Sequence, residues 1–143
     1  MATSTRFSVA VHALAALALH RDKPMTSEEI AGSVCTNPAV IRRLLSDLAR
    51  AGLTASQLGK GGGALLAKKP KKISLLDIYL AVERPGLIAR PRGAPDQTCP
   101  VGRNIQPALG RITDQAEAAF MATLAAASLK DIVQEIKAES QAA

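Results

Sequence analysis

The chain contains 143 residues, with 18 Lys and Arg against 12 Asp and Glu, two Phe, one Tyr and no Trp. This length allows one compact domain with an appendage, but not two independent domains joined by a long linker. The scarcity of aromatic residues excludes a ladder on which single-stranded bases stack, so duplex DNA is the favoured nucleic-acid partner.

The positive charge is concentrated in the first part of the chain. Residues 1–83 contain 11 Lys and Arg against 6 Asp and Glu, whereas residues 84–143 contain 7 against 6. A basic surplus attracts polyanions, because each neutralised phosphate releases condensed counterions. The alternative is a surplus that only keeps the protein in solution.

Residues 7–19 form an apolar stretch that has the length of a signal-peptide core. The stretch is shorter than the roughly 20 apolar residues of a membrane span, and its apolar residues recur on one side of a helix. We therefore interpret it as the first helix of a cytoplasmic protein without a membrane segment. His12 and His20 lie on this helix without a second ligand at metal-binding spacing, so we expect no metal site.

A helix-turn-helix is predicted after this helix. Thr26 and Glu29 have the spacing of a capping box, which predicts a short helix that continues to Val34. About three residues, Cys35 to Asn37, separate it from a second capped helix.

The second helix is the predicted DNA-recognition helix. Asn37 is a favoured N-cap, Pro38 suits the first helical position, and Gly52 can adopt the left-handed conformation that follows a helix. An apolar stripe is formed by Ile41, Leu44, Leu45 and Leu48. The candidate DNA contacts lie at the helix start and on its opposite face: Thr36, Asn37, Pro38, Ala39, Arg42, Arg43 and Ser46. Arginine fits both guanine edges and phosphates, and the alternative is an ordinary solvated charged face.

Two short apolar segments around a glycine tract predict a β-hairpin with its tip at residues 57–63. Glycines would let the backbone approach DNA without a side-chain clash, and a lysine adds charge. The candidate contacts on this wing are Gly59, Lys60, Gly61 and Gly62. A plain flexible hairpin is the alternative, whereas a nucleotide-binding loop is excluded because Lys60 is not followed by Ser or Thr.

The remaining chain divides into three parts. Ser74 and Asp77 predict a capped helix that closes a DNA-binding domain at residues 1–83, and residues 84–98 form a Pro- and Gly-rich, flexible linker or sensor loop. Residues 99–143 form a helical dimerisation region, in which Pro107 implies a kink or a later helix start near Gln106. An apolar seam on this helix needs a partner, and we expect a homodimer through Ile105, Leu109, Ile112, Ala116, Phe120 and Leu124.

The two cysteines are candidate redox sensors rather than a structural disulfide. If Cys99 caps the long helix, the helix dipole and Arg103 favour its thiolate, although an inert place in the dimer interface is the alternative. Cys35 is expected to be a small buried hydrophobe. A regulatory bond from Cys99 to its copy across the dimer, or to Cys35, is a hypothesis.

These motifs together resemble the Rrf2-type regulators, a bacterial winged-helix family, and most of all its cluster-free YwnA-like branch. The resemblance rests on Arg6 to Leu19, residues 26–52, the glycine-rich wing at 59–67, residues 73–83 and residues 99–102. It implies a dimeric, sequence-specific transcriptional regulator, usually a repressor. Cluster-binding members carry three cysteines after the wing helix, whereas this chain has only Cys99 there, which implies no iron-sulfur cluster and no other cofactor.

The predicted fold class is therefore mostly α with a small β-hairpin: a winged helix-turn-helix domain plus a long C-terminal dimerisation helix. The predicted function is DNA binding by a homodimeric repressor, with thiol oxidation as a candidate signal. A winged-helix module that binds an acidic protein partner is the alternative. The motifs supply no nucleophile with a base and no paired carboxylates, so we expect no enzyme activity.

Overall fold

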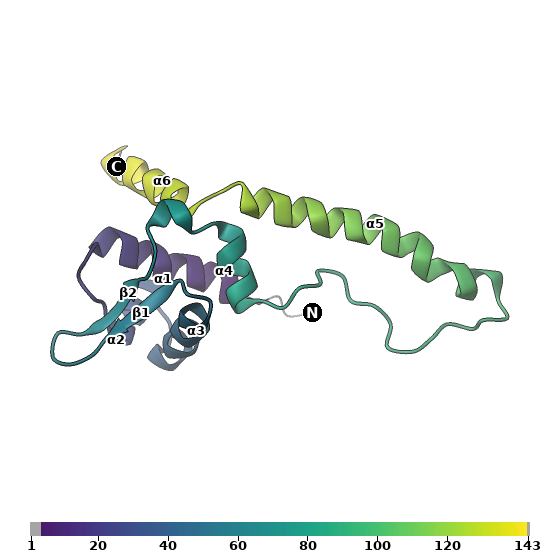
Figure 1. Ribbon diagram of the computed structural model, residues 1–143, viewed down its shortest axis with the longest axis horizontal. Helices are drawn as coiled ribbons and strands as arrows, with labels where there is room; N and C mark the ends of the chain where they lie inside the picture. Colours follow the sequence, from purple (N-terminus) through teal and green to yellow (C-terminus); the bar gives the residue numbers. More distant parts are fainter. Residues whose placement is uncertain (1–3, 143) are drawn as a thin grey trace.

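The computed structural model describes residues 4–142, which form helices around a two-stranded antiparallel sheet (Figure 1). The elements in chain order are α1 (Arg6–His20), α2 (Ser27–Val34), α3 (Pro38–Arg50), β1 (Thr54–Gln57), β2 (Gly63–Leu66), η1 (Pro70–Lys72), α4 (Leu75–Val82), α5 (Pro100–Ala125) and α6 (Leu129–Ala142). The predicted fold class is confirmed. None of the helices within residues 4–142 has the length and apolarity that a membrane crossing requires.

Helix α1 lies at the centre of the domain. It packs against α2, α3, α4, α6 and β2, and it buries Ala10, Ala13, Leu14 and Leu17. Small side chains at two of these positions let neighbouring helices approach closely. The apolar stretch that resembled a signal-peptide core is thus the central helix of the domain.

The helix-turn-helix has the predicted ends. The Thr26 hydroxyl accepts a hydrogen bond from the Glu29 N–H at 3.1 Å, and the Glu29 carboxylate accepts one from the Thr26 N–H at 2.8 Å. The Asn37 side chain caps α3 by accepting from the Ala39 N–H at 2.8 Å. These caps satisfy N–H groups that have no partner within their helices.

The hairpin pairs Thr54 with Leu66 and Gln57 with Gly63, so the predicted wing is confirmed with its tip at residues 58–62. A third backbone segment extends the sheet at Met25, just before α2. The Met25 N–H donates to the Ala64 carbonyl at 3.1 Å, and the Ala64 N–H donates to the Met25 carbonyl at 2.7 Å. This pair of bonds joins the wing to the start of the helix-turn-helix.

Helix α5 projects from the winged-helix unit as a long arm (Figure 1). Its base is joined to the unit by the chain's three aromatic residues. Phe7 of α1 and Phe120 of α5 both make edge contacts with Tyr79 of α4, at centroid distances of 5.7 and 5.2 Å. The later start near Gln106 is wrong, because α5 begins at Pro100 and Pro107 lies inside it.

Helix α6 returns to the winged-helix unit, which the sequence did not predict. The Leu129 N–H donates to the Ile73 carbonyl at 2.8 Å, and the Leu75 N–H donates to the Ala127 carbonyl at 2.9 Å. Leu129 and Val133 are buried in the same core as α1 and α3. The chain after α5 therefore contributes to the core of the N-terminal unit.

The segment between α4 and α5 is irregular, and it runs out to the far end of the arm (Figure 1). Two polar contacts join it to α5: the Leu87 N–H donates to Glu117 at 3.0 Å, and Arg90 pairs with Asp114 at 3.2 Å. Near its end, hydrogen bonds from Thr98 hold the pKa of Asp96 below its usual value. The predicted linker is thus fastened to the arm at these points.

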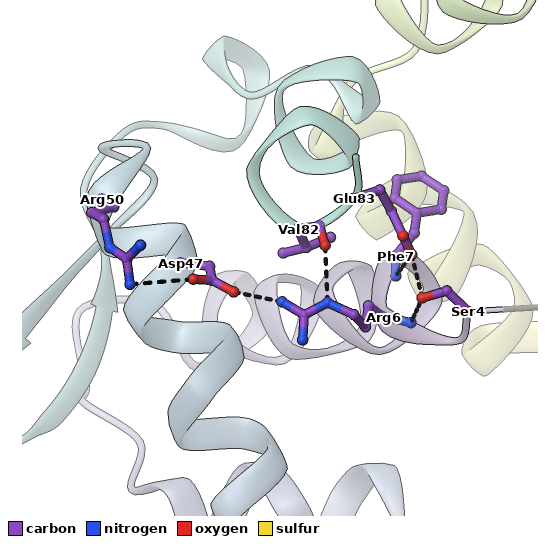
Figure 2. Close-up of polar contacts among 7 residues, drawn as sticks. All are labelled: Ser4, Arg6, Phe7, Asp47, Arg50, Val82 and Glu83. Atoms are coloured by element: carbon purple, nitrogen blue, oxygen red, sulfur yellow. Dashed lines mark hydrogen bonds and ion pairs between the residues drawn. The ribbon is translucent and has the colours of Figure 1, made fainter. Parts of the chain in front are cut away.

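One arginine connects three helices of the winged-helix unit (Figure 2). Arg6 of α1 donates from Nε to the Val82 carbonyl of α4 at 2.9 Å and from Nη2 to the Asp47 carboxylate of α3 at 2.5 Å. The opposite oxygen of Asp47 pairs with Arg50 at 3.4 Å. Arg6 therefore fixes α3 relative to α1 and α4.

The substitution Arg6→Met should lower the free energy of unfolding by about 1.5–3 kcal/mol, because hydrogen bonds to charged groups contribute about that much. The matched control Arg50→Met should change it by less than about 0.5 kcal/mol, since Arg50 is mostly exposed and its ion pair with Asp47 lies at the surface. Urea denaturation followed by circular dichroism measures both values. Equal effects of the two substitutions would contradict the role assigned to Arg6.

Candidate nucleic-acid interface

The outer face of α3 carries the predicted recognition residues on one surface. Ile41, Leu44 and Leu48 are buried below it. Leu45 is half-buried, as are Thr36 and Pro38 near the helix start. The exposed members of the predicted set are Asn37, Ala39, Arg42, Arg43 and Ser46. The stripe and the outer face are thus arranged as predicted.

The two arginines of this face have different surroundings. Arg42 donates from Nη1 to the Glu28 carboxylate of α2 at 3.0 Å. Arg43 forms no ion pair with any of the residues 4–142. Arg43 is therefore available for an external anion, whereas Arg42 already has an acidic neighbour.

A groove of about 500 Å³ separates α3 from the base of the wing. Arg42 and Ser46 of α3 line this groove together with Ser56 and Gln57 of β1, and Ser27 of α2 also lines it. The sequence did not identify Ser27, Ser56 or Gln57 as candidates. The polar residues of β1 were an available signal, and all positions of that strand after Thr54 are exposed.

The backbone conformation and close packing of the wing require glycine at several positions. Gly59 and Gly61 have φ values of +92° and +76°, which other residues rarely adopt. A Cβ at Gly62 would lie 2.1 Å from the Gln57 carbonyl oxygen, and one at Gly63 would lie 2.4 Å from that of Met25. The tract therefore shapes the wing, and the tip between these glycines presents an exposed Lys60.

The predicted dimer seam is divided between two environments. Ile105, Leu109 and Ile112 are 44, 51 and 62 % exposed, and α5 has no buried residue. Phe120 and Leu124 are half-buried near the base of the arm, where Phe120 contacts Tyr79 of its own chain. Ile105 and Leu109 also line a small cavity of about 130 Å³ beneath the segment that precedes α5. Ala116 is exposed, so the distal part of the seam is the uncovered part.

The structure overturns one expectation about the cysteines. Cys35 is exposed rather than buried, because it ends α2 in the left-handed conformation, at φ +62°, in the turn before α3. Cys99 is half-buried and is the N-cap residue of α5, as the sequence suggested. Its side chain makes no capping hydrogen bond.

Neither histidine lies in a metal-binding cluster. The Nε2 atom of His12 lies 2.8 Å from the Ser33 hydroxyl, which links α1 to α2. Across the described part of the chain, no three His, Cys, Asp or Glu side chains are arranged to hold a metal ion.

A capped helix-turn-helix with arginines on its second helix, followed by a glycine-tipped hairpin, defines a winged-helix protein of the kind that binds DNA. The chain belongs to the Rrf2 family, described as iron-dependent transcriptional regulators, whose profile matches residues 3–135. The family consists of regulators rather than enzymes. The chain is 38 % identical to the HTH-type transcriptional regulator YwnA of Bacillus subtilis over 133 residues, which are 93 % of this chain and 98 % of YwnA.

Solved structures have the same fold. A crystallised DNA-binding protein is 39 % identical, with a TM-score of 0.70 over 89 % of this chain and 97 % of its own. A transcriptional regulator from Lactobacillus plantarum is 30 % identical, with a TM-score of 0.78 over 93 % of this chain and 90 % of its own. The global cysteine regulator CymR of Bacillus subtilis, at 22 % identity, shares the fold with a TM-score of 0.73 over 94 % of this chain and 98 % of its own.

The family description names iron, but the side chains of one chain do not fit a thiolate-bound iron centre. Such centres are held by several cysteine thiolates. Cys35 and Cys99 are the only cysteines in the sequence. Cys35 lies in the helix-turn-helix and Cys99 at the start of the arm, and neither joins a cluster of ligands among residues 4–142.

Proposed function

We propose that this protein is a cytoplasmic, sequence-specific transcriptional regulator that binds duplex DNA as a homodimer and acts as a repressor. The observation that carries the proposal is the surface formed by α3 and the wing. Arg42 and Ser46 of α3 line one groove together with Ser56 and Gln57 at the base of the wing. Arg43 and Lys60 are exposed, and the apolar stripe of α3 is buried. This arrangement offers a helix for the major groove and a slender hairpin for an adjacent part of the duplex.

In this proposal, repression of transcription requires only that the protein occupies its operator. A repressor of this kind blocks transcription by binding, and its own residues need to recognise bases and phosphates rather than perform chemistry. We further propose that the protein works without an iron-sulfur cluster or another cofactor. The support is the scarcity of thiolate ligands, with two cysteines in the whole sequence.

The homodimer is proposed to form through the distal half of α5. Ile112 is 62 % exposed on an arm that buries no residue of its own, and apolar surface of this kind is stabilised by a second copy. Two recognition helices would then read two half-sites, so operator binding would be symmetric. The arm sets the distance between the half-sites in such a dimer.

Arg43→Ala should weaken binding to the preferred duplex by about 1–3 kcal/mol, or about 5- to 150-fold, because an unpaired arginine on the outer face of α3 is lost. The exposed Lys137 of α6 provides the control, because Lys137→Ala removes the same charge from a different element and should leave the affinity unchanged. Fluorescence anisotropy with a 30-base-pair duplex, selected from a random pool by the wild-type protein, measures the affinities. If Arg43 contacts a phosphate, the salt dependence should also decrease by about one unit.

The alternative, a module that binds an acidic protein partner, predicts a different outcome. In that case no duplex would be enriched from the pool at physiological salt, and Arg43→Ala would leave DNA binding unchanged.

Ile112→Glu should convert the dimer into a monomer, because the substitution places a charge in the apolar seam. Ala118→Glu is the control, since residue 118 lies on the opposite side of α5 at helical spacing and is exposed. Sedimentation velocity measures the mass of each variant. A monomeric wild-type protein, or a dimer that survives Ile112→Glu, would contradict the proposed interface.

Thiol oxidation is the proposed input signal. The support is the exposed position of Cys35 between the two helices of the helix-turn-helix and the position of Cys99 at the start of the arm. Oxidation of Cys35 would act on the helix-turn-helix, and oxidation of Cys99 would act on α5, the proposed dimer helix.

Mild peroxide should therefore weaken DNA binding in a gel-shift assay, and dithiothreitol should restore it. The double substitution Cys35→Ser and Cys99→Ser should abolish this response and retain binding, while each single substitution identifies the sensing thiol. Mass mapping without reductant then distinguishes a disulfide from a sulfenic acid. Two free thiols after peroxide treatment would exclude the switch.

A further inference from the structure

An ion pair crosses the helix-turn-helix at the proposed DNA surface. Glu28 lies in the first turn of α2 and Arg42 lies in the second turn of α3. The Arg42 Nη1 atom donates to the Glu28 Oε1 atom at 3.0 Å, and the two side chains are 58 and 67 % exposed. The pair therefore lies on the surface rather than within the core that holds the two helices together.

Stability does not account for this pair. Exposed ion pairs contribute little to the free energy of unfolding, because water and salt screen them. The apolar contacts of Ile30 and Ile41 with the core already fix the two helices. A carboxylate on a surface that meets phosphates also reduces general affinity for DNA, since like charges repel.

The geometry of the pair instead suits the orientation of Arg42 for contact with a base. An isolated arginine side chain samples many rotamers, and a fixed partner reduces the entropy that is lost when it binds. The bond to Glu28 occupies one N–H of Nη1, and Arg42 makes no other hydrogen bond with residues 4–142, so its Nε and Nη2 atoms keep their donors. The spacing of these two donors matches that of the O6 and N7 acceptors of a guanine.

We propose that Glu28 determines sequence specificity by positioning Arg42 for a bidentate contact with a guanine. Arg42 supplies discrimination between bases, whereas the unpaired Arg43 supplies affinity. Glu28 acts through Arg42 and also penalises contacts with unselected DNA. The inference rests on the proposed DNA-binding function and extends it to the residue that selects the base.

The test separates specificity from affinity. Affinities of the wild-type protein, Glu28→Ala and Glu28→Gln are measured by anisotropy for the duplex selected by the wild-type protein and for a random duplex of the same length. Glu28→Ala should bind the random duplex more tightly and should lower the ratio of the two affinities at least about fivefold, the lower bound of one bidentate contact. Glu28→Gln should lie between Glu28→Ala and the wild type.

Two further variants identify the residue through which Glu28 acts. Arg42→Ala alone should lower the ratio, and its addition to Glu28→Ala should lower the ratio by a smaller factor than it does alone. Glu139→Ala, which removes the same charge from an exposed position on α6, should leave the ratio unchanged. A new selection with Glu28→Ala should lose guanine at one position of each half-site, and Arg42→Ala should lose it at the same position.

Each contrary result has a defined meaning. Equal strengthening of binding to both duplexes by Glu28→Ala would overturn the inference and leave a purely electrostatic role, with the proposed function intact. Independent, additive losses in the double variant would also overturn it. Failure of the wild-type protein to enrich any duplex would overturn the proposed function and this inference together. Unchanged melting temperatures of the variants show that folding is not the cause.

Discussion

The arrangement of the proposed DNA surface depends on the burial of one side of α3. Ile41, Leu44 and Leu48 lie in the core. A helix with one apolar stripe can bury that stripe in only one rotational orientation about its axis. Burial of such side chains contributes about 1.5–3 kcal/mol each, so other rotations of α3 are strongly disfavoured. The positions of Arg42 and Arg43 follow from this rotation rather than from contacts of their own.

The same core extends to parts of the chain that are far apart in the sequence. Leu129 and Val133 of α6 are buried with α1 and α3, and the bridge between Ser74 and Ser128 aligns the starts of α4 and α6. Together with the contact between Tyr79 of α4 and Phe120 of α5, these interactions join the base of α5 to the winged-helix unit. In the proposed dimer, a change in how two copies join along α5 would act on elements that share the core with α3.

Charged residues serve two purposes in this domain. Asp47 lies between Arg6 and Arg50, and its partly buried bond to Arg6 joins α3 to α1. Glu28 and Arg42 are exposed, and their pair has little weight in folding. The difference is one of dielectric environment, because partial burial strengthens a charged hydrogen bond and exposure weakens it. The first kind of pair stabilises the fold, and the second is the pair that we propose acts in DNA recognition.

The sequence by itself determined the local elements: the caps at Thr26 and Asn37, the stripe of α3, the glycine-tipped hairpin and the family. These depend on side-chain to backbone bonds and on periodicity, which span only a few residues. Only the tertiary structure decided the return of α6 to the core, the exposure of Cys35, the contact of Phe120 with its own chain, and the pairing of Glu28 with Arg42. Each of these depends on which element lies opposite another in space, and local patterns do not encode that information.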